Sequence, residues 1–141
     1  METLTLELTT AIKASKENVW KALTDAEQIK KYFFGTETKS DWKVGSSITF
    51  SGVWDGTPYL DKGTILEIET QKILKYNYWS SFSGIEDVPA NYANITYLLG
   101  ERGGETLYTI IQEGIKTEEA REHSKQNWQM VIASLKELLE K

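Results

Sequence analysis

The stretch TEEAREHSKQNWQMVIASLKELLEK, residues 117–141, decides how the rest of the chain must be arranged. Thr117 is a suitable N-cap, and the two glutamates after it favour the positive end of a helix dipole. Apolar residues then recur at steps of three and four, which places them on one side of an α-helix: Trp128, Val131, Ile132, Leu135, Leu138 and Leu139. The pattern predicts a long helix whose apolar face needs a large partner surface.

The middle of the chain supplies that surface. Between residues 45 and 113, apolar and polar residues alternate between turn residues, which indicates antiparallel strands with one buried face. Asp55 and Gly56 tolerate the positive φ of a tight hairpin turn. Residues 80–90 form the longest irregular stretch. We therefore expect a meandering sheet with one long loop.

A first strand and two short helices precede the sheet. Leu4, Leu6 and Leu8 alternate with polar residues, while Ser15 and Asp25 are suitable N-caps for two helices. These helices are too short to pack alone, so we expect them to close one end of a larger element. The sequence predicts an α+β fold in one domain, residues 1–141, with a curved antiparallel sheet of six or seven strands around a long C-terminal helix.

Composition narrows the classes of function. A chain of 141 residues with 40% hydrophobic residues fits one domain with a real core. The net charge of −5 argues against nucleic acid or an anionic membrane surface as a partner. The absence of cysteine excludes a disulfide, a thiolate nucleophile and cysteine-ligated zinc. The alternating N-terminus is not typical of a signal peptide or membrane span, so we expect a cytoplasmic monomer or homodimer without membrane insertion.

Few residues carry a signal for catalysis. His123 lies among polar residues, so we expect it on the surface, and a single histidine does not favour a zinc site. Glu67 would become a catalytic candidate if it pointed inward, because burial would raise its pKa, but we expect it to face water. Gln112 is the better candidate for a polar group inside the fold. The sequence assigns no catalytic residue, metal ligand or cofactor.

Aromatic residues are the outlying feature, with five Trp, seven Tyr and four Phe. Several tyrosines on the inner face of one sheet bring hydroxyl groups into an apolar space, where each needs a hydrogen-bond partner. Those partners are other side chains, water or a ligand. We predict a cavity between the sheet and the C-terminal helix, and the alternative is a core that the rings fill themselves. The predicted lining is Phe33, Phe50, Trp54, Tyr59, Tyr76, Tyr78, Tyr97, Tyr108, Gln112, Ser124 and Trp128.

The N-terminal half of the last helix is more polar than its C-terminal half. Arg121, Ser124 and Gln126 occupy this half, whereas the continuous apolar stripe begins at Trp128. We therefore expect the cavity to open beside this polar half, next to the loop of residues 80–90.

Four stretches resemble one protein family in order and spacing. They are VWKALTDAE (residues 19–27), GVWDG (52–56), GTILEI (63–68) and the helical ending at 128–140. Together they are similar to the START/Bet v 1-like (SRPBCC) superfamily, and within it to the branch named for the C-terminal domain of the activator of Hsp90 ATPase. Residues 69–71 replace the proline-rich turn usual in that branch, which affects a hairpin tip.

The resemblance implies a helix-grip fold with a cavity between sheet and helix. Members of this superfamily bind lipids, sterols, polyketides and other hydrophobic molecules, and a few cyclise polyketides. We expect a binder of a lipid-like or aromatic small molecule. One alternative is an interaction module of Hsp90 co-chaperone type, which needs a second domain for which we expect no room in this chain. The other is a polyketide cyclase-like enzyme with an inward polar dyad.

Overall fold

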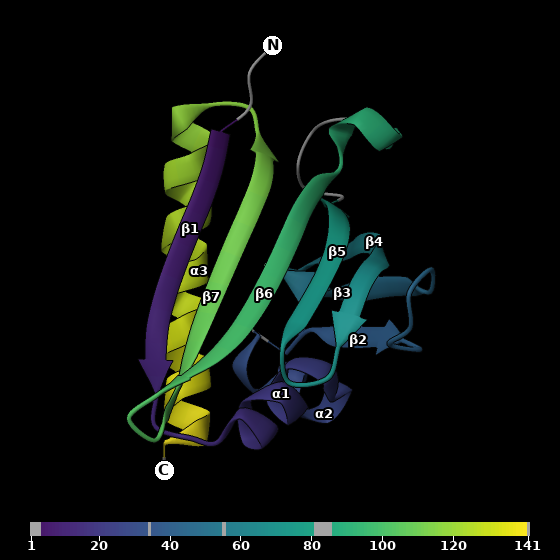
Figure 1. Ribbon diagram of the computed structural model, residues 1–141. Coiled ribbons are helices and arrows are strands. Elements are labelled where there is room, and N and C mark those ends of the chain that lie inside the picture. The colour runs from purple at the N-terminus through teal and green to yellow at the C-terminus, as the bar shows by residue number, and fades with distance from the viewer. Residues whose placement is uncertain (1–3, 34, 55, 81–85, 141) are drawn as a thin grey trace.

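The computed structural model describes residues 4–33, 35–54, 56–80 and 86–140, with Trp54 described by its backbone alone. Figure 1 shows the elements in chain order. They are β1 (Leu4–Ile12), α1 (Lys16–Thr24), α2 (Ala26–Tyr32), β2 (Glu37–Ser40), β3 (Ser47–Trp54), β4 (Thr57–Glu69), β5 (Ile73–Ser80), the 3-10 turn η1 (Pro89–Asn91), β6 (Ala93–Arg102), β7 (Glu105–Ile115) and α3 (Glu118–Leu139).

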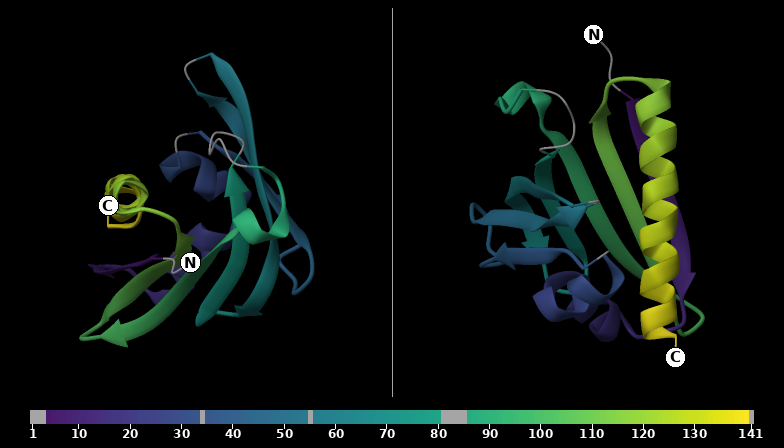
Figure 2. Two further views of the ribbon diagram at one scale, coloured as in Figure 1. Left: turned by 90° about the horizontal axis from the view of Figure 1, so that it is seen from above. Right: turned by 180° about the vertical axis from the view of Figure 1, so that it is seen from behind.

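Seven strands form one antiparallel sheet in the order β1-β7-β6-β5-β4-β3-β2. Consecutive strands are neighbours except that β1 pairs with β7, which brings both ends of the chain to one edge. The sheet bends strongly, α3 runs along β1 and β7, and α1 and α2 close the lower end (Figures 1 and 2). The predicted helix-grip architecture is confirmed, with seven strands.

The three predicted helix starts are confirmed. Ser15 Oγ accepts a hydrogen bond from the amide of Asn18 at 3.1 Å, and Asp25 Oδ1 accepts one from the amide of Glu27 at 3.0 Å. Thr117 Oγ1 caps α3 in the same way, at 3.0 Å from its donor. Each side chain satisfies one of the amide groups that a helix start leaves without a partner.

Helix α3 is divided into two unlike halves. Its C-terminal half buries Trp128, Val131 and Leu135, whereas none of the residues from Glu118 to Asn127 is buried. The amide of Lys13, just after β1, donates to Glu140 Oε2 at 2.9 Å, beyond the end of the helix. The C-terminal half is therefore the part that holds the helix on the sheet.

Strand β2 was not predicted from the sequence. Its four residues, Glu37–Ser40, contain no apolar side chain and give no alternating hydrophobic signal. It forms the sheet edge beside β3, where Thr38 lies opposite Phe50 and Ser40 opposite Ile48. Because Phe50 and Ile48 are buried, this register turns Thr38 and Ser40 toward the inner side of the sheet.

Gly63 lies directly against the backbone of β5. A Cβ atom at this position would lie 1.7 Å from the carbonyl oxygen of Asn77. Asn77 Oδ1 also accepts a hydrogen bond from the amide of Thr64 at 2.7 Å, and the strand register shifts between Ile65 and Glu67. Only glycine therefore fits at position 63, two residues before this irregularity in the strand pairing.

Candidate functional site

Aromatic side chains fill the space between the sheet and α3. Trp128 lies edge-on to Phe33 and Tyr97, with ring centroids 6.3 Å and 6.0 Å away. Phe33 stacks on Phe50 at 6.2 Å, and Tyr97 meets the edge of Tyr76 at 5.6 Å. These contacts link helix α3 to strands on both sides of the bend. We call this network the aromatic cluster: Phe33, Phe50, Tyr76, Tyr78, Tyr97, Tyr108 and Trp128.

Polar atoms inside the aromatic cluster find partners within the protein. The hydroxyl groups of Tyr76 and Tyr97 are 2.8 Å apart and share a hydrogen bond. The indole N–H of Trp128 donates to Gln112 Oε1 at 2.8 Å. The side chain of Gln112 therefore lies on the inner side of the sheet, against Trp128. These bonds meet the requirement that buried polar groups be paired without a ligand.

Two further hydroxyl groups lie at the half-buried margin of the aromatic cluster. Tyr78 donates to Asp61 Oδ2 at 2.6 Å, and the Tyr59 hydroxyl lies 2.6 Å from Thr36 Oγ1. Asp61 was not predicted, although it stands opposite Phe50 in the ladder and so faces inward. A carboxylate beside a tyrosine hydroxyl is a polar dyad of the kind that acid–base chemistry uses.

Burial keeps the tyrosines of the cluster in their neutral form. It raises the pKa of Tyr76, Tyr97 and Tyr108 well above the ordinary value of 10.0. Burial also raises the pKa of Tyr78, and the charge of Asp61 adds to that effect. These hydroxyl groups act as hydrogen-bond donors and acceptors near neutral pH rather than as bases or nucleophiles.

The enclosed cavity beneath α2 is small. Its volume is about 10 Å³, whereas holding a single water molecule takes roughly 10–15 Å³ on the same measure. The rings beside this cavity thus leave almost no free space there. The cavity is lined by Leu23, Ile29, Tyr32, Phe33, Trp42, Ile48, Phe50, Leu74, Tyr76 and Tyr97.

The predicted lining residues fall into groups. Five are buried in the core: Phe50, Tyr76, Tyr97, Tyr108 and Trp128. Five are half-buried: Phe33, Tyr59, Tyr78, Gln112 and Ser124. The side chain of Trp54 lies outside the described residues, as do residues 81–85 of the loop where we expected the opening. Ser124 makes no ring contact or hydrogen bond with the described part of the cluster, whereas the other nine belong to it or adjoin it.

A second hollow lies at the sheet edge formed by β2, with a volume of about 490 Å³. We call it the polar groove, and its lining is Ala26, Thr38, Lys39, Ser40, Asp41, Trp42, Ser47 and Thr49. Trp42 lines both this groove and the small enclosed cavity. Sequence reasoning missed the groove, because its only signal is one tryptophan within a stretch of Ser, Thr, Lys and Asp.

Other candidates from the sequence lie at the surface. His123 and Glu67 are both exposed, as expected. Across the described ranges, no group of three or more His, Asp or Glu residues could hold a metal ion. None of the helices within those ranges is long and apolar enough to cross a membrane.

A bent antiparallel sheet, a helix gripped along it and an aromatic interior define a helix-grip domain. The chain belongs to the family described as Activator of Hsp90 ATPase homolog 1-like protein, which matches residues 13–140. The comparison with curated proteins returned no match.

Solved structures agree with this assignment. The solution structure of a Cytophaga hutchinsonii protein is 40% identical, covers 99% of this chain and 97% of its own, and has a TM-score of 0.86. The Aha1 dimer from Colwellia psychrerythraea is 19% identical with a TM-score of 0.77, covering 97% of this chain and 96% of its own. DynU16, from the dynemicin biosynthetic locus, is 16% identical with a TM-score of 0.81, covering 97% of this chain and 47% of its own. The last two support the fold alone.

Proposed function

We propose that this protein binds a hydrophobic, aromatic or lipid-like small molecule against the aromatic cluster, between the sheet and α3. The observation that carries the proposal is the half-buried margin of the cluster. There Phe33, Tyr78 and Tyr59 offer aromatic rings. The two tyrosines also carry hydroxyl groups, and Gln112 adds an amide. Apolar walls with a few convergent polar groups are typical of small-molecule sites.

Binding requires a ring to move, because the enclosed space of about 10 Å³ admits no such ligand. Phe33 is the best candidate for that ring. It is half-buried and follows directly after α2, and it separates Phe50 from Trp128 through contacts with both. A ligand that takes the place of this ring would gain the same two aromatic contacts. The free protein would then bind less tightly than a variant in which the space is already open.

Thermal unfolding with a panel of apolar compounds tests the proposal. A ligand at 100 times its Kd should stabilise the fold by about 2.7 kcal/mol. Phe33→Ala should lower stability but increase the shift in Tm produced by a naphthalene or fatty-acid probe, because the site is opened in advance. Val53→Ala, on the exposed outer face, is the control and should leave the shift unchanged. The proposal fails if neither the unchanged protein nor Phe33→Ala is stabilised by any compound.

A protein-binding role has separate support from the outer face of the β3–β4 hairpin. Val53 is 67% exposed and Leu60 is 47% exposed, and Pro58 lies directly opposite Val53 on the same face. The Colwellia neighbour was solved as a dimer, and a chaperone partner is the alternative that the family name raises. If this face binds a second copy, Val53→Lys with Leu60→Lys should convert dimer to monomer in sedimentation at unchanged Tm. Sedimentation as a monomer before substitution would exclude self-association.

A further inference from the structure

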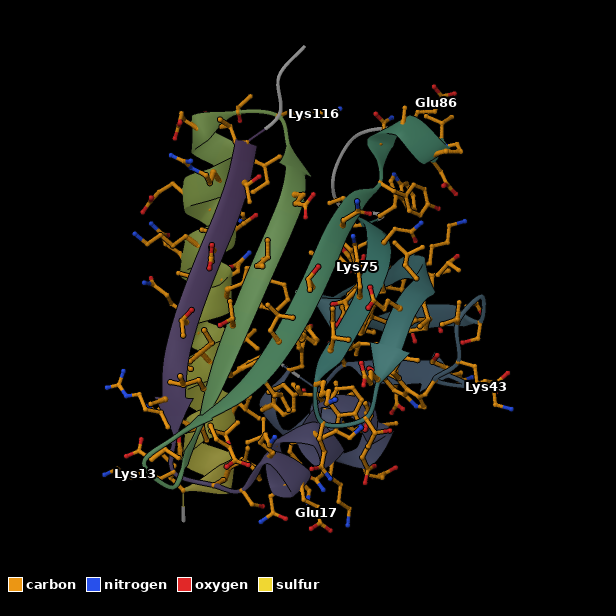
Figure 3. All side chains as sticks on the ribbon, viewed as in Figure 1. Lys13, Glu17, Lys43, Lys75, Glu86 and Lys116 are labelled. Atoms are coloured by element: carbon orange, nitrogen blue, oxygen red, sulfur yellow. The ribbon has the colours of Figure 1, made fainter. Side chains whose placement is uncertain are left out.

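The polar groove is separate from the aromatic cluster in position and in chemistry. It lies at the edge strand β2 and the loop that follows it, at the sheet edge opposite to β1, which α3 contacts. Figure 3 labels Lys43 in this loop, on the far side of the molecule from β1 in that view. Its volume of about 490 Å³ falls within the range of roughly 300–1,000 Å³ that small-molecule sites occupy. Nothing in the proposed function uses it.

The loop beside the groove is held in one conformation by serine side chains. Ser40 Oγ accepts a hydrogen bond from the amide of Trp42 at 3.0 Å. Ser46 Oγ donates to the carbonyl oxygen of Lys43 at 2.7 Å and accepts from the amide of Lys43 at 3.2 Å. Within this loop Trp42 has a φ of 55°, in the left-handed region that bulky residues rarely adopt. Strained backbone held by its surroundings is often found where a protein positions a side chain for binding.

The lining of the groove carries one group of each charge, from Lys39 and Asp41. Lys39 and Asp41 are both exposed, and neither forms an ion pair with any residue that the structure describes. One ammonium group and one carboxylate leave the lining with no net charge. The lining therefore does not select an anion or a cation, but it offers strong donors and strong acceptors together.

Hydroxyl groups supply the rest of the polar lining, from Ser40, Ser47 and Thr49. Thr38 also lines the groove and is only 4% exposed. In the described ranges, its Oγ1 is the one buried side-chain polar atom without a hydrogen-bond partner. A buried hydroxyl without a partner is costly, so the structure has a polar atom next to the groove whose partner is missing.

We propose that the polar groove binds a sugar ring. An uncharged ring with several hydroxyl groups matches a lining of zero net charge that mixes donors and acceptors. The hydroxyl groups of the ring would pair with Lys39, Asp41 and the lining hydroxyls, and its apolar C–H face would lie on the indole of Trp42. An apolar ligand would leave these polar groups without partners, and an ion would find one of the two charges repulsive.

NMR of the ¹⁵N-labelled protein tests the site directly. Methyl glucoside, methyl galactoside and N-acetylglucosamine, each added to about 50 mM, should saturate any site with a Kd near a few millimolar. We expect saturable shifts of the Trp42 indole signal and of the amides of residues 38–49. Sorbitol carries similar hydroxyl groups without a ring and should cause no saturable shift. The proposal is overturned if no sugar shifts these signals or if sorbitol shifts them equally.

Variants of the groove give an independent test. Asp41→Asn and Lys39→Met change exposed side chains and should leave Tm unchanged, while each weakens sugar binding about tenfold, the loss expected for one charge-assisted hydrogen bond. Lys43→Met, in the same loop but outside the lining, is the matched control and should bind as before. Equal sugar affinity in Asp41→Asn and the unchanged protein would exclude the site. The binding of apolar probes at the aromatic cluster should be the same in all three variants, so the two proposals can fail separately.

Discussion

The aromatic cluster and the polar groove differ in where their polar atoms find partners. In the cluster, Trp128 donates to Gln112, and the cavity beside Phe33, Phe50 and Tyr76 has a volume of about 10 Å³. In the groove, Lys39 and Asp41 lack ion-pair partners within the described ranges, and the space is about 490 Å³. The larger of these two hollows thus lies where the sequence is polar, whereas the cavity beside the rings is small. Each prediction below is directed at one of the two regions.

Alkaline pH should have the largest effect on stability, and it should act chiefly through Tyr32 and the tyrosines of the aromatic cluster. Burial raises the pKa of Tyr32, Tyr76, Tyr78, Tyr97 and Tyr108 above the unfolded value of 10.0. Stability is therefore fully present below pH 10 and falls above it, because the unfolded chain releases protons that the folded chain retains. Each tyrosine contributes about 1.4 kcal/mol per pH unit in this range.

Denaturant unfolding between pH 9 and 12 measures this loss. Tyr108→Phe should reduce the slope of the unfolding free energy against pH by the contribution of one tyrosine, about 1.4 kcal/mol per pH unit. No tyrosine lines the polar groove, so the variant should leave sugar binding unchanged. A stability that stays flat up to pH 12 would contradict the burial of these hydroxyl groups.

Trp128→Ala should have the next largest effect. It removes the ring that joins Phe33 to Tyr97, and large-to-small changes of a buried Trp cost about 3–5 kcal/mol. The space left behind should admit free indole, so indole should raise the Tm of the variant more than that of the unchanged protein. Met130→Ala, on the exposed side of the same helix, should change stability by less than about 0.5 kcal/mol. Equal losses for the two variants would mean that α3 is not anchored by Trp128.

Gln112→Met tests the pairing inside the cluster at nearly constant volume. It leaves the indole N–H of Trp128 without its acceptor, and a buried unpaired donor costs about 1–3 kcal/mol. Urea unfolding measures the change. Gln129→Met, at an exposed position of α3, is the control and should be neutral. If both variants unfold at the same urea concentration as the unchanged protein, the bond between Gln112 and Trp128 contributes nothing.

Thr38→Val should have the smallest effect on stability, and unlike the other substitutions it should not destabilise the fold. It removes a buried hydroxyl that has no partner, so stability should stay constant or rise by up to about 1 kcal/mol. Thr106→Val is the matched control, because Thr106 is equally buried but donates to the carbonyl oxygen of Ala14 at 2.6 Å. That variant should lose about 1–3 kcal/mol. A similar loss in both variants would mean that Thr38 has a partner in solution.

The fold was predictable because its signals are local and repeated. Helix caps at Ser15, Asp25 and Thr117 and the alternation along the strands required no knowledge of packing. Strand β2 was missed because its four polar residues show no alternation of apolar and polar side chains. They form a strand only because they pair with β3.

The candidate sites were less predictable, for two physical reasons. Whether Phe33 and Tyr97 enclose a cavity or fill it depends on how the rings pack, and ring identity alone does not determine that. Asp61 faces inward because it pairs with Phe50 in the first half of β4. The alternating apolar pattern identifies β4 only from residue 64, so the orientation of Asp61 could not be predicted. The position of the Trp42 side chain depends on a left-handed backbone conformation, which periodic sequence patterns do not reveal.

Trp42 lines the enclosed cavity and the polar groove at once. A single side chain shared by two compartments is the element through which binding in one would be coupled to binding in the other. If a molecule in the groove shifts the indole and changes affinity at the aromatic cluster by some factor, a molecule at the cluster changes affinity in the groove by that same factor. A measurement at either compartment then reports on both.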